Sequence, residues 1–378
     1  MSLPESGRTR LIEIPEELEE ICDRIRRHGR VAIDTEFFWE RTFYPQLGLV
    51  QLALHEKQAW LIDIPALNNR LAPLGRILAD PTIEKIIHDA RQDLTILKNQ
   101  TGSYPRNIFD TRLACGFIGP SANYSLFELC RTFADRNLSK EETRSNWLQR
   151  PLNPEQCQYA LEDVIFLPRI RTAIKQKAEL LERWAWIDEE MKLYDRPELY
   201  DDPPFDQVFT KVKGCRRLSG KELALLRELA AWREKEARRR DLPRRHVLSD
   251  EMLVNLAIRQ PQTLASLKNN CDLPARSGQR HGQALLEAIK KGLQTPAELW
   301  PQPANERQKK TARAPYRKIS DFILELGREH NLDPGLLANR QQIEDLIETR
   351  GSDPKRHPLL QGWRHEFAGR RIIADFLS

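Results

Sequence analysis

Three β-like runs follow one another near the start of the chain and set the strongest limit on its fold. They are "RVAIDTEFF", "LGLVQLALH" and "AWLIDI", all within residues 30–64, and short polar or glycine-containing breaks separate them. Successive strands with such short breaks are typical of an antiparallel meander. We therefore expect a β-sheet to organise the first part of the chain.

The spacing of the apolar residues changes after this meander. "RLAPLGRILAD", "ARQDLTILKN" and "YSLFELCRTFA" have helical spacing, whereas "EKIIHD" and "NIFDT" are short apolar strands. Strands that alternate with helices indicate parallel members added to the sheet. From about residue 153 to 194 the spacing is wholly helical. The sequence thus predicts an α/β domain over residues 1–195, with a mixed sheet flanked by helices.

The remainder of the chain is predicted to be all-α. With 378 residues, the protein is too long for one ordinary core. A segment rich in proline and aspartate, 196–212, predicts a linker, and a helical domain follows over 213–293. A second linker, 294–315, is rich in proline, glutamine and lysine. A last helical block occupies 316–378.

Composition excludes several classes of protein. Hydrophobic residues make up 40% of the chain, which is too many for a disordered protein. No apolar stretch is long enough to span a bilayer, and the amino terminus lacks the apolar core of a signal peptide. The six cysteines are scattered without a C-x-x-C pair, as in reduced cytoplasmic proteins. We expect a cytoplasmic protein that does not bind membranes and, since no heptad pattern is present, a monomer.

Two acids stand directly behind an apolar strand in "VAIDTEFFWE". Asp34 and Glu36 are two residues apart, so their side chains lie on one face of the strand. Asp188 and Glu190 have the same spacing, but they lie in a polar helical run and are expected to be solvated. An edge strand with two surface acids remains the alternative for the first pair.

Two further sites add acids to this set. Asp93 is expected in the first turns of the helix after "EKIIHD", where Asp89 is the better candidate for the capping residue. Tyr159 and Asp163 are four residues apart in "QYALEDVIFL", so they share one helix face. His88 is expected to be structural. Taken singly, capping and surface pairing explain these residues.

Together the acids predict a metal site. Carboxylates from a strand end and from two helices would repel one another in one pocket unless cations lay between them. Hard oxygen ligands select Mg²⁺ or Mn²⁺. Two such ions about 4 Å apart suit an in-line phosphoryl displacement. We therefore expect Asp34, Glu36, Asp93 and Asp163 to bind two divalent cations.

The same residues resemble the motifs of a known family. "AIDTEF", "HDARQD" and "YALEDV" resemble the three motifs of DEDDy 3′→5′ exonucleases, and "ERTFYPQLGLVQLAL" and "RSNWLQRPLNPEQCQYALEDVIFLP" are similar to ribonuclease D. "LRELAAWREKEARRRDLPRRHVLSDEML" resembles the HRDC domain that follows in that family, and the last block resembles a second HRDC domain loosely. The resemblance implies a ribonuclease H-like exonuclease domain and two HRDC-like helical domains.

The resemblance also implies an activity and a role for each residue. The expected reaction is hydrolysis of RNA 3′ ends to nucleoside 5′-monophosphates, with tRNA precursors and other structured RNAs as substrates. Asp34 would bridge both metal ions, Glu36 and Asp163 would hold one, and Asp93 would hold the other. Tyr159 would orient or help deprotonate the attacking water.

Aromatic and basic residues are the predicted RNA contacts. Phe37 and Phe38 follow the acids and could stack on the last bases, although strand alternation directs one of them into the core. Five of the six arginines in "REKEARRRDLPRR" are predicted to contact RNA, and a solvated helix face with pairs such as Glu234 with Arg238 is the alternative. These arginines are Arg238, Arg239, Arg240, Arg244 and Arg245.

Two other functions fit parts of this pattern. A DNA 3′→5′ exonuclease would use the same acids, and only the tract "NWLQRPL" and the HRDC-like domains favour RNA. An inactive nucleic-acid-binding scaffold is the third hypothesis. Such scaffolds usually lose an acid, whereas all four acids are present in this chain.

Overall fold

The computed structural model divides the chain into two compact units. It describes residues 11–68, 70–119, 121–138, 145–270, 273, 275–303, 313–355 and 357–377. The first unit consists of the described residues within Met1–Phe38, Leu47–Asp201 and Gln308–Ser378. The second unit consists of the described residues within Trp39–Gln46 and Asp202–Arg307.

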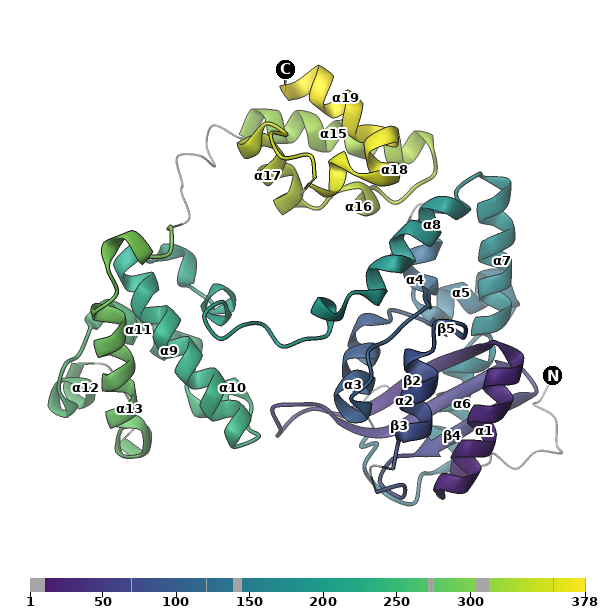
Figure 1. Cartoon of the computed structure of the whole chain (residues 1–378), viewed down its shortest axis with the longest axis horizontal. Helices are drawn as coiled ribbons and strands as arrows, with labels where there is room; N and C mark the ends of the chain where they lie inside the picture. Colours follow the sequence, from purple (N-terminus) through teal and green to yellow (C-terminus); the bar gives the residue numbers. More distant parts are fainter. Residues whose placement is uncertain are drawn as a thin grey trace. The chain divides into compact units, whose positions relative to one another are not determined.

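A mixed six-stranded sheet organises the first unit, in the order β1-β4-β3-β2-β5-β6 (Figure 1). Strands β3 and β4 are antiparallel, whereas β1 with β4, β2 with β5 and β5 with β6 are parallel. The predicted mixed sheet is therefore confirmed, with the short strand β1 as an addition. The strands are β1 (Leu11–Ile12), β2 (Arg30–Phe38), β3 (Gln46–His55), β4 (Gln58–Asp63), β5 (Glu84–Ile87) and β6 (Ile108–Asp110).

Helices cover both faces of this sheet (Figure 1). Apolar side chains of the first group of helices pack with Val31 and Ile33 of β2. The second group packs with Ala32 and Ala53 on the opposite face. The first group is α1 (Pro15–His28), α2 (Ala72–Ala79) and α3 (Arg91–Thr101). The second group is α4 (Thr111–Cys115), α5 (Leu126–Leu129), α6 (Pro154–Ile165), α7 (Leu167–Leu180) and α8 (Trp184–Met191).

Strand alternation decides where the two acids of β2 point. Ala32 is fully buried on the face covered by α4–α8, and every second residue of a strand shares a face. Asp34 and Glu36 therefore point toward the same side as Ala32, where α6 packs against β2. Phe37 packs in the core on the other side, with the residues of α1–α3.

The second unit is a helical domain together with the loop between β2 and β3. Its helices share a core that includes Leu226, Leu253 and Leu285. Phe43, from the loop, packs against Ala237, and its N–H donates to Asp241 Oδ1 at 2.9 Å. The helices are α9 (Gly220–Arg239), α10 (Arg244–Val247), α11 (Asp250–Arg259), α12 (Leu264–Asn270) and α13 (Ala275–Leu293).

The carboxyl-terminal helical region packs within the first unit and corrects one expectation. Asp188 lies at the surface and pairs with Lys192, but Glu190 is only 4% exposed and not solvated. Glu190 accepts hydrogen bonds from Trp363 Nε1 and Arg364 Nη2, each at 2.9 Å. The helices of this region are α15 (Arg313–Glu329), α16 (Pro334–Leu337), α17 (Arg340–Thr349), α18 (Gly362–Arg364) and α19 (Arg370–Ile372).

Two global expectations can be compared with the described residues. Each of the five cysteines in the described part of the chain is a free thiol, and Cys271 lies outside that part. Burial raises the pKa of Cys22, Cys115 and Cys130 to about 12, as for unreactive buried thiols. Among the described helices, none combines the length and apolarity needed to cross a membrane.

Candidate active site

Three carboxylates meet where β2 faces α6. Asp34 and Glu36 come from the strand, and Asp163 comes from the helix, and each offers an oxygen within 4.8 Å of the other two. All three side chains are half-buried. The structure thus brings Asp163 close to two acids that lie more than a hundred residues earlier in the sequence.

Asp93 lies beside this group but does not belong to it. It is in the first turn of α3, where the helix dipole favours a negative charge. Its Oδ1 accepts a hydrogen bond from the hydroxyl of Thr35, the residue between the two acids of β2. Its charge also raises the pKa of Asp34 and of Glu36. Asp93 therefore lies at the edge of the cluster formed by Asp34, Glu36 and Asp163.

Burial and mutual repulsion raise the pKa of each of these acids when no cation is bound. Burial, together with the charges of the neighbouring acids, raises the pKa of Asp34 well above its ordinary value and that of Glu36 to about 9. Burial also raises the pKa of Asp163 to about 7, against the hydrogen bond from Tyr159. Burial raises the pKa of Asp93 to about 6. A site of this kind is poised to exchange protons for metal ions.

Tyr159 lies one helical turn before Asp163 on α6. Burial and then the charge of Asp163 raise its pKa above the ordinary value, so the phenol stays protonated at neutral pH. Its ring lies 6.2 Å from that of Trp147, which is 2% exposed. A neutral phenol can both donate and accept a hydrogen bond. Tyr159 is therefore suited to orient a water molecule beside the carboxylates.

A buried ion pair fixes the segment that leads into α6. Arg150 Nε donates to Asp63 Oδ2 at 2.5 Å, and Arg150 Nη2 donates to Asp63 Oδ1 at 2.9 Å. The same Nη2 donates to the carbonyl of Gly48 on β3, and Nη1 donates to the carbonyl of Trp147. This two-pronged pair ties the segment before α6 to the ends of β3 and β4. Sequence reasoning missed both members of the pair.

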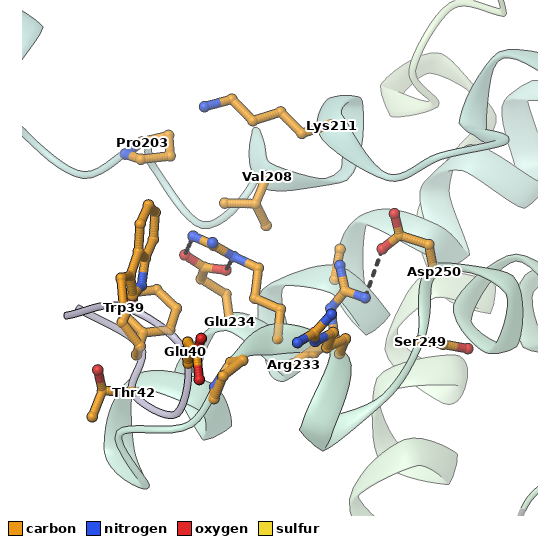
Figure 2. Close-up of a pocket in the computed structure, with 15 residues that line it drawn as sticks. Trp39, Glu40, Thr42, Pro203, Val208, Lys211, Arg233, Glu234, Ser249 and Asp250 are labelled. Atoms are coloured by element: carbon orange, nitrogen blue, oxygen red, sulfur yellow. Dashed lines mark hydrogen bonds and ion pairs between the residues drawn. The ribbon is translucent and has the colours of Figure 1, made fainter. Parts of the chain in front are cut away.

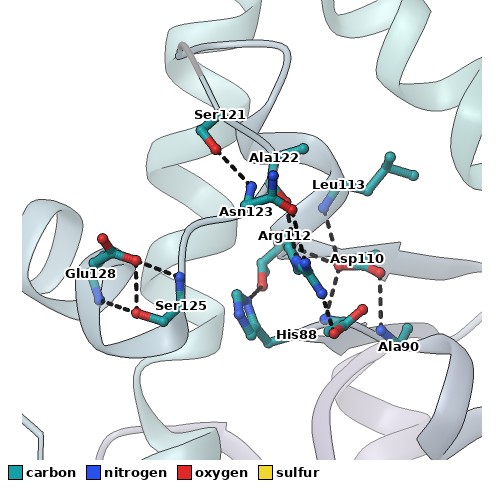
Figure 3. Close-up of polar contacts among 12 residues, drawn as sticks. His88, Ala90, Asp110, Arg112, Leu113, Ser121, Ala122, Asn123, Ser125 and Glu128 are labelled. Carbon is teal, nitrogen blue, oxygen red and sulfur yellow. Dashed lines mark hydrogen bonds and ion pairs between the residues drawn. The ribbon is translucent and has the colours of Figure 1, made fainter. Parts of the chain in front are cut away.

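Asp110 organises the turn that precedes α3 (Figure 3). Its carboxylate accepts hydrogen bonds from the N–H groups of Asp89 at 3.1 Å and Ala90 at 3.0 Å. It also accepts from the N–H of Arg112 at 2.9 Å and from the hydroxyl of Tyr194 at 2.6 Å. Asp110 thus caps α4 and holds the start of α3, which carries Asp93.

The expected capping role of Asp89 is wrong. The residue before α3 is Ala90, which makes no side-chain cap, and Asp89 has a left-handed backbone with φ of 59°. The side chain of Asp89 forms an ion pair with Arg112 instead. His88 has the structural role expected of it, because its Nδ1 lies 3.0 Å from the hydroxyl of Thr111.

The donor set of the site fits a hard divalent cation. Asp34, Glu36 and Asp163 supply only carboxylate oxygens, which Mg²⁺ and Mn²⁺ prefer over softer ligands. The pKa of each is raised by burial, and a bound cation would relieve that penalty. The arrangement can therefore bind metal ions and act on a phosphate ester.

The residues predicted to contact RNA are placed in different environments. Phe37 is partly buried and packs against the core, whereas alternation puts Phe38 on the face of the acids. Glu234, which is 1% exposed, forms ion pairs with Arg238 at 3.0 Å and with Arg244 at 2.6 Å. Two further arginines bind Glu236, namely Arg239 at 2.9 Å and Arg240 at 3.9 Å. Within the described residues, Arg245 has no ion-pair partner.

The comparisons with known proteins agree with this geometry. Residues 9–179 match the family described as 3′–5′ exonuclease, and residues 222–289 match the HRDC domain. The chain is 35% identical over 359 residues to ribonuclease D of Desulfotalea psychrophila, covering 94% of this chain and 96% of that protein. The chain belongs to the ribonuclease D family.

Other members of the family support the same assignment. Ribonuclease D of Escherichia coli is 32% identical over 362 residues, covering 94% of this chain and 95% of that protein. The crystal structure of E. coli RNase D matches with a TM-score of 0.87 and 29% identity, over 97% of this chain and 98% of that one. The protein is accordingly a metal-dependent 3′→5′ exoribonuclease with an exonuclease domain, an HRDC domain and a helical carboxyl-terminal region.

Proposed function

We propose that the chain trims the 3′ ends of structured RNAs, tRNA precursors among them, with two divalent cations held by its four acids. The proposal is supported by the three carboxylate oxygens within 4.8 Å of one another. It is also supported by the E. coli relative, which is described as an exoribonuclease involved in structured RNA processing. Mg²⁺ and Mn²⁺ are the cations we propose.

Each acid has a proposed share in the metal site. Asp34 would hold both ions, Glu36 and Asp163 would hold one of them, and Asp93 would support the second. The hydrogen bond from Thr35 to Asp93 leaves this carboxylate at the edge of the cluster, which favours contact through a water molecule. When bound, two cations supply the positive charge that stabilises the attacking and leaving oxygens of phosphodiester hydrolysis.

Aromatic side chains near the acids position the water and the RNA. Tyr159 holds the attacking water through its hydroxyl group, since this phenol remains protonated at neutral pH. Phe38 lies on the face of the acids and stacks on the terminal base, whereas Phe37 supports the strand from the core. Each turnover releases one nucleoside 5′-monophosphate.

The basic segment of the second unit contributes to RNA affinity. Arg245 is exposed and contacts phosphates directly, whereas Arg238 and Arg244 keep a positive surface around the buried Glu234. Arg239 and Arg240 share Glu236 and add to the same surface. Affinity for RNA should therefore fall steeply with salt.

We also propose domain boundaries, an oligomeric state and a cellular location for the protein. The exonuclease domain comprises 1–195, the HRDC domain 213–293 and a second HRDC-like domain 316–378, with linkers at 196–212 and 294–315. The described part of the carboxyl-terminal region consists of helices, from α15 to α19, which supports its likeness to an HRDC domain. The protein is proposed to act as a cytoplasmic monomer, and light scattering of the purified chain would show a mass near 44.1 kDa.

The test uses a 3′-labelled tRNA carrying extra trailing nucleotides. With Mg²⁺, the wild-type chain should release the labelled 3′-terminal nucleotide as a nucleoside 5′-monophosphate, and a chelator should stop the release. A DNA oligomer with the same 3′ overhang serves as the competing substrate. Faster hydrolysis of DNA than of RNA would contradict the proposed substrate.

Matched variants assign the activity to the site. Asp34→Asn and Asp163→Asn should each abolish release of mononucleotides, because each removes a charge from the metal ligands. Asp188→Asn is the control, since this exposed aspartate forms a surface ion pair with Lys192. Full activity of the Asp163→Asn variant would place the reaction elsewhere.

A further inference from the structure

The second unit contains a pocket of about 640 Å³ that the metal site does not use (Figure 2). Fifteen residues line it, and all of them belong to this unit. Trp39 and Phe43 come from the loop between β2 and β3, and the other walls come from α9, α10, α11 and the segment before α9. The volume lies in the range of small-ligand pockets.

A buried arginine in this pocket lacks one hydrogen-bond acceptor. Arg233 is only 6% exposed, and its Nη1 donates to Asp250 Oδ1 at 2.7 Å and to the carbonyl of Leu248 at 2.9 Å. Its Nε is buried, and no atom of the described residues accepts a hydrogen bond from it. An unmet buried N–H group is unfavourable, so the guanidinium favours a ligand that carries an acceptor.

The charges around the pocket favour an anion as that ligand. Lys211 and Arg245 are exposed at its rim, and neither has an ion-pair partner among the described residues. Two of the three acids of the pocket are neutralised, since Asp250 binds Arg233 and Glu234 binds arginines, whereas Glu40 is exposed and has no ion-pair partner in the described part of the chain. Figure 2 shows the ammonium end of Lys211 reaching across the pocket. A phosphate group suits this arrangement of donors.

Trp39 adds a surface for a base. Its side chain is 51% exposed, although its Nε1 donates to the carbonyl of Phe43 at 3.1 Å, which fixes the ring. The Phe43 ring is in turn covered by the guanidinium of Arg244 at 4.6 Å. An exposed, anchored indole next to phosphate donors is a combination that single-stranded nucleic-acid sites use.

The chain itself keeps this surface near the reaction centre. Trp39 follows Glu36 by three residues, and three extended residues span at most about 11 Å. Trp39 is therefore close enough to Glu36 for an RNA strand that ends at the acids to reach it. The preceding nucleotides, and not the terminal one, are the part of the substrate that can reach the pocket.

We propose that this pocket binds one unpaired nucleotide upstream of the RNA 3′ end, with its base on Trp39 and its phosphate at Arg233, Lys211 and Arg245. The inference rests on the proposed function, because it assumes an RNA substrate at the four acids. It explains how the HRDC-containing unit contributes to binding a flexible 3′ tail. Substrates too short to reach the pocket lose this contribution.

The first test compares a ten-nucleotide unstructured RNA with a dinucleotide, using the full-length protein and Mg²⁺. Trp39→Ala should lower the ratio of kcat/KM for the long substrate over the short one about ten-fold, the value of one base–aromatic stack. Trp39→Phe retains an aromatic face and should restore most of this ratio. An unchanged ratio in Trp39→Ala, or an equal loss on both substrates, would overturn the proposal.

The second test measures phosphate contacts from the salt dependence of binding. Affinity for the ten-nucleotide RNA is measured in EDTA, where no hydrolysis occurs, at several salt concentrations. The double variant Lys211→Ala/Arg245→Ala should reduce the slope of log affinity against log salt by about 1.4, or about 0.7 for each lost contact. Arg217→Ala/Lys221→Ala removes two exposed cations outside the pocket and should leave the slope unchanged. Equal slopes in both double variants would refute the proposed contacts.

A third measurement uses only the wild-type protein, so it does not require that any variant folds. Wild-type protein is irradiated with RNA that carries 4-thiouridine at single positions, and the cross-linked peptides are mapped. Cross-links to the peptide with Trp39 should come from internal positions and not from the 3′-terminal one. Cross-linking from the terminal position alone would contradict the pocket. If the wild-type chain hydrolyses no RNA with Mg²⁺, the proposed function fails first, and this outcome is distinct from a loss confined to the long substrate.

Discussion

Replacing Glu36 by glutamine should stabilise the metal-free protein although it destroys the enzyme. The folded-state pKa of Glu36 is raised to about 9 by burial and by the charges of Asp163 and Asp93, against an ordinary value of 4.5. Between these two pH values the folded protein retains a proton that the unfolded chain has released. The unfolding free energy of the wild type therefore decreases with rising pH in this window.

The size of the effect follows from the same pKa values. Each pH unit above 4.5 removes about 1.4 kcal/mol of stability for one retained proton, which gives an upper limit of about 5 kcal/mol at pH 8. Because Glu36 is half-buried and water can enter the site, we expect about half of this limit. A gain of about 2.5 kcal/mol corresponds to a rise of about 5–10 °C in Tm for a domain of this size.

Thermal unfolding of the unit that contains Glu36 provides the assay. In EDTA, wild-type Tm should fall from pH 6 to pH 9, whereas Glu36→Gln should fall less and exceed the wild type at pH 8. At pH 4.5 the two proteins should unfold at similar temperatures. Saturating Mg²⁺ should stabilise the wild type more than the variant. Glu155→Gln, an exposed change in the first turn of α6, is the control and should follow the wild type.

The opposite result would refute the repulsion argument. If Glu36→Gln were less stable than the wild type at pH 8 in EDTA, its carboxylate would have stabilising partners that the structure does not show. A difference independent of pH would assign the effect to packing, since a change in ionisation must vary with pH.

Three other outcomes test the surroundings of the acids. Tyr159→Phe should lower kcat about 100-fold or more through loss of its hydroxyl, while Mg²⁺ should still raise Tm as in the wild type, measured by single-turnover hydrolysis and thermal unfolding. Asp63→Asn should lower the unfolding free energy by about 3 kcal/mol, because it leaves the Arg150 guanidinium without its buried partner, as checked by urea unfolding. Glu190→Gln should destabilise by a similar amount through Arg364, whereas Asp188→Asn should change stability by less than about 0.5 kcal/mol.

The parts of the site that follow from local periodicity could be predicted from the sequence. A period of two puts Asp34 and Glu36 on one strand face, and a period of nearly four puts Tyr159 and Asp163 on one helix face. Phe37 shows the limit of the same rule, because alternation requires one of two phenylalanines to be buried without saying which. The structure assigns Phe37 to the core because Val31 and Ile33 lie on its face.

Interactions between distant segments could not be predicted in this way. Asp188 and Glu190 lie two residues apart in α8, yet only Glu190 is buried, because Trp363 and Arg364 cover it from more than 170 residues away. Asp63 ends an ordinary apolar strand, and nothing in its neighbourhood indicates a partner 87 residues later. Local patterns fix the direction of a side chain but not the segment that it meets.

The acids and the Asp63–Arg150 pair exert opposite forces on the same helix. Without cations, Asp163 and the acids of β2 repel one another once they lose their protons, which tends to separate α6 from the strand. The pair between Asp63 and Arg150 holds the segment before α6 to β3 and β4. The tract "NWLQRPL", which resembles ribonuclease D, therefore has a mechanical role that needs no contact with RNA. Through Arg150, the tract keeps the carboxylates of α6 and β2 close enough for cations to bind to a site that is already formed. Bound cations then remove the repulsion between these carboxylates, which the Asp63–Arg150 pair opposes in the metal-free protein.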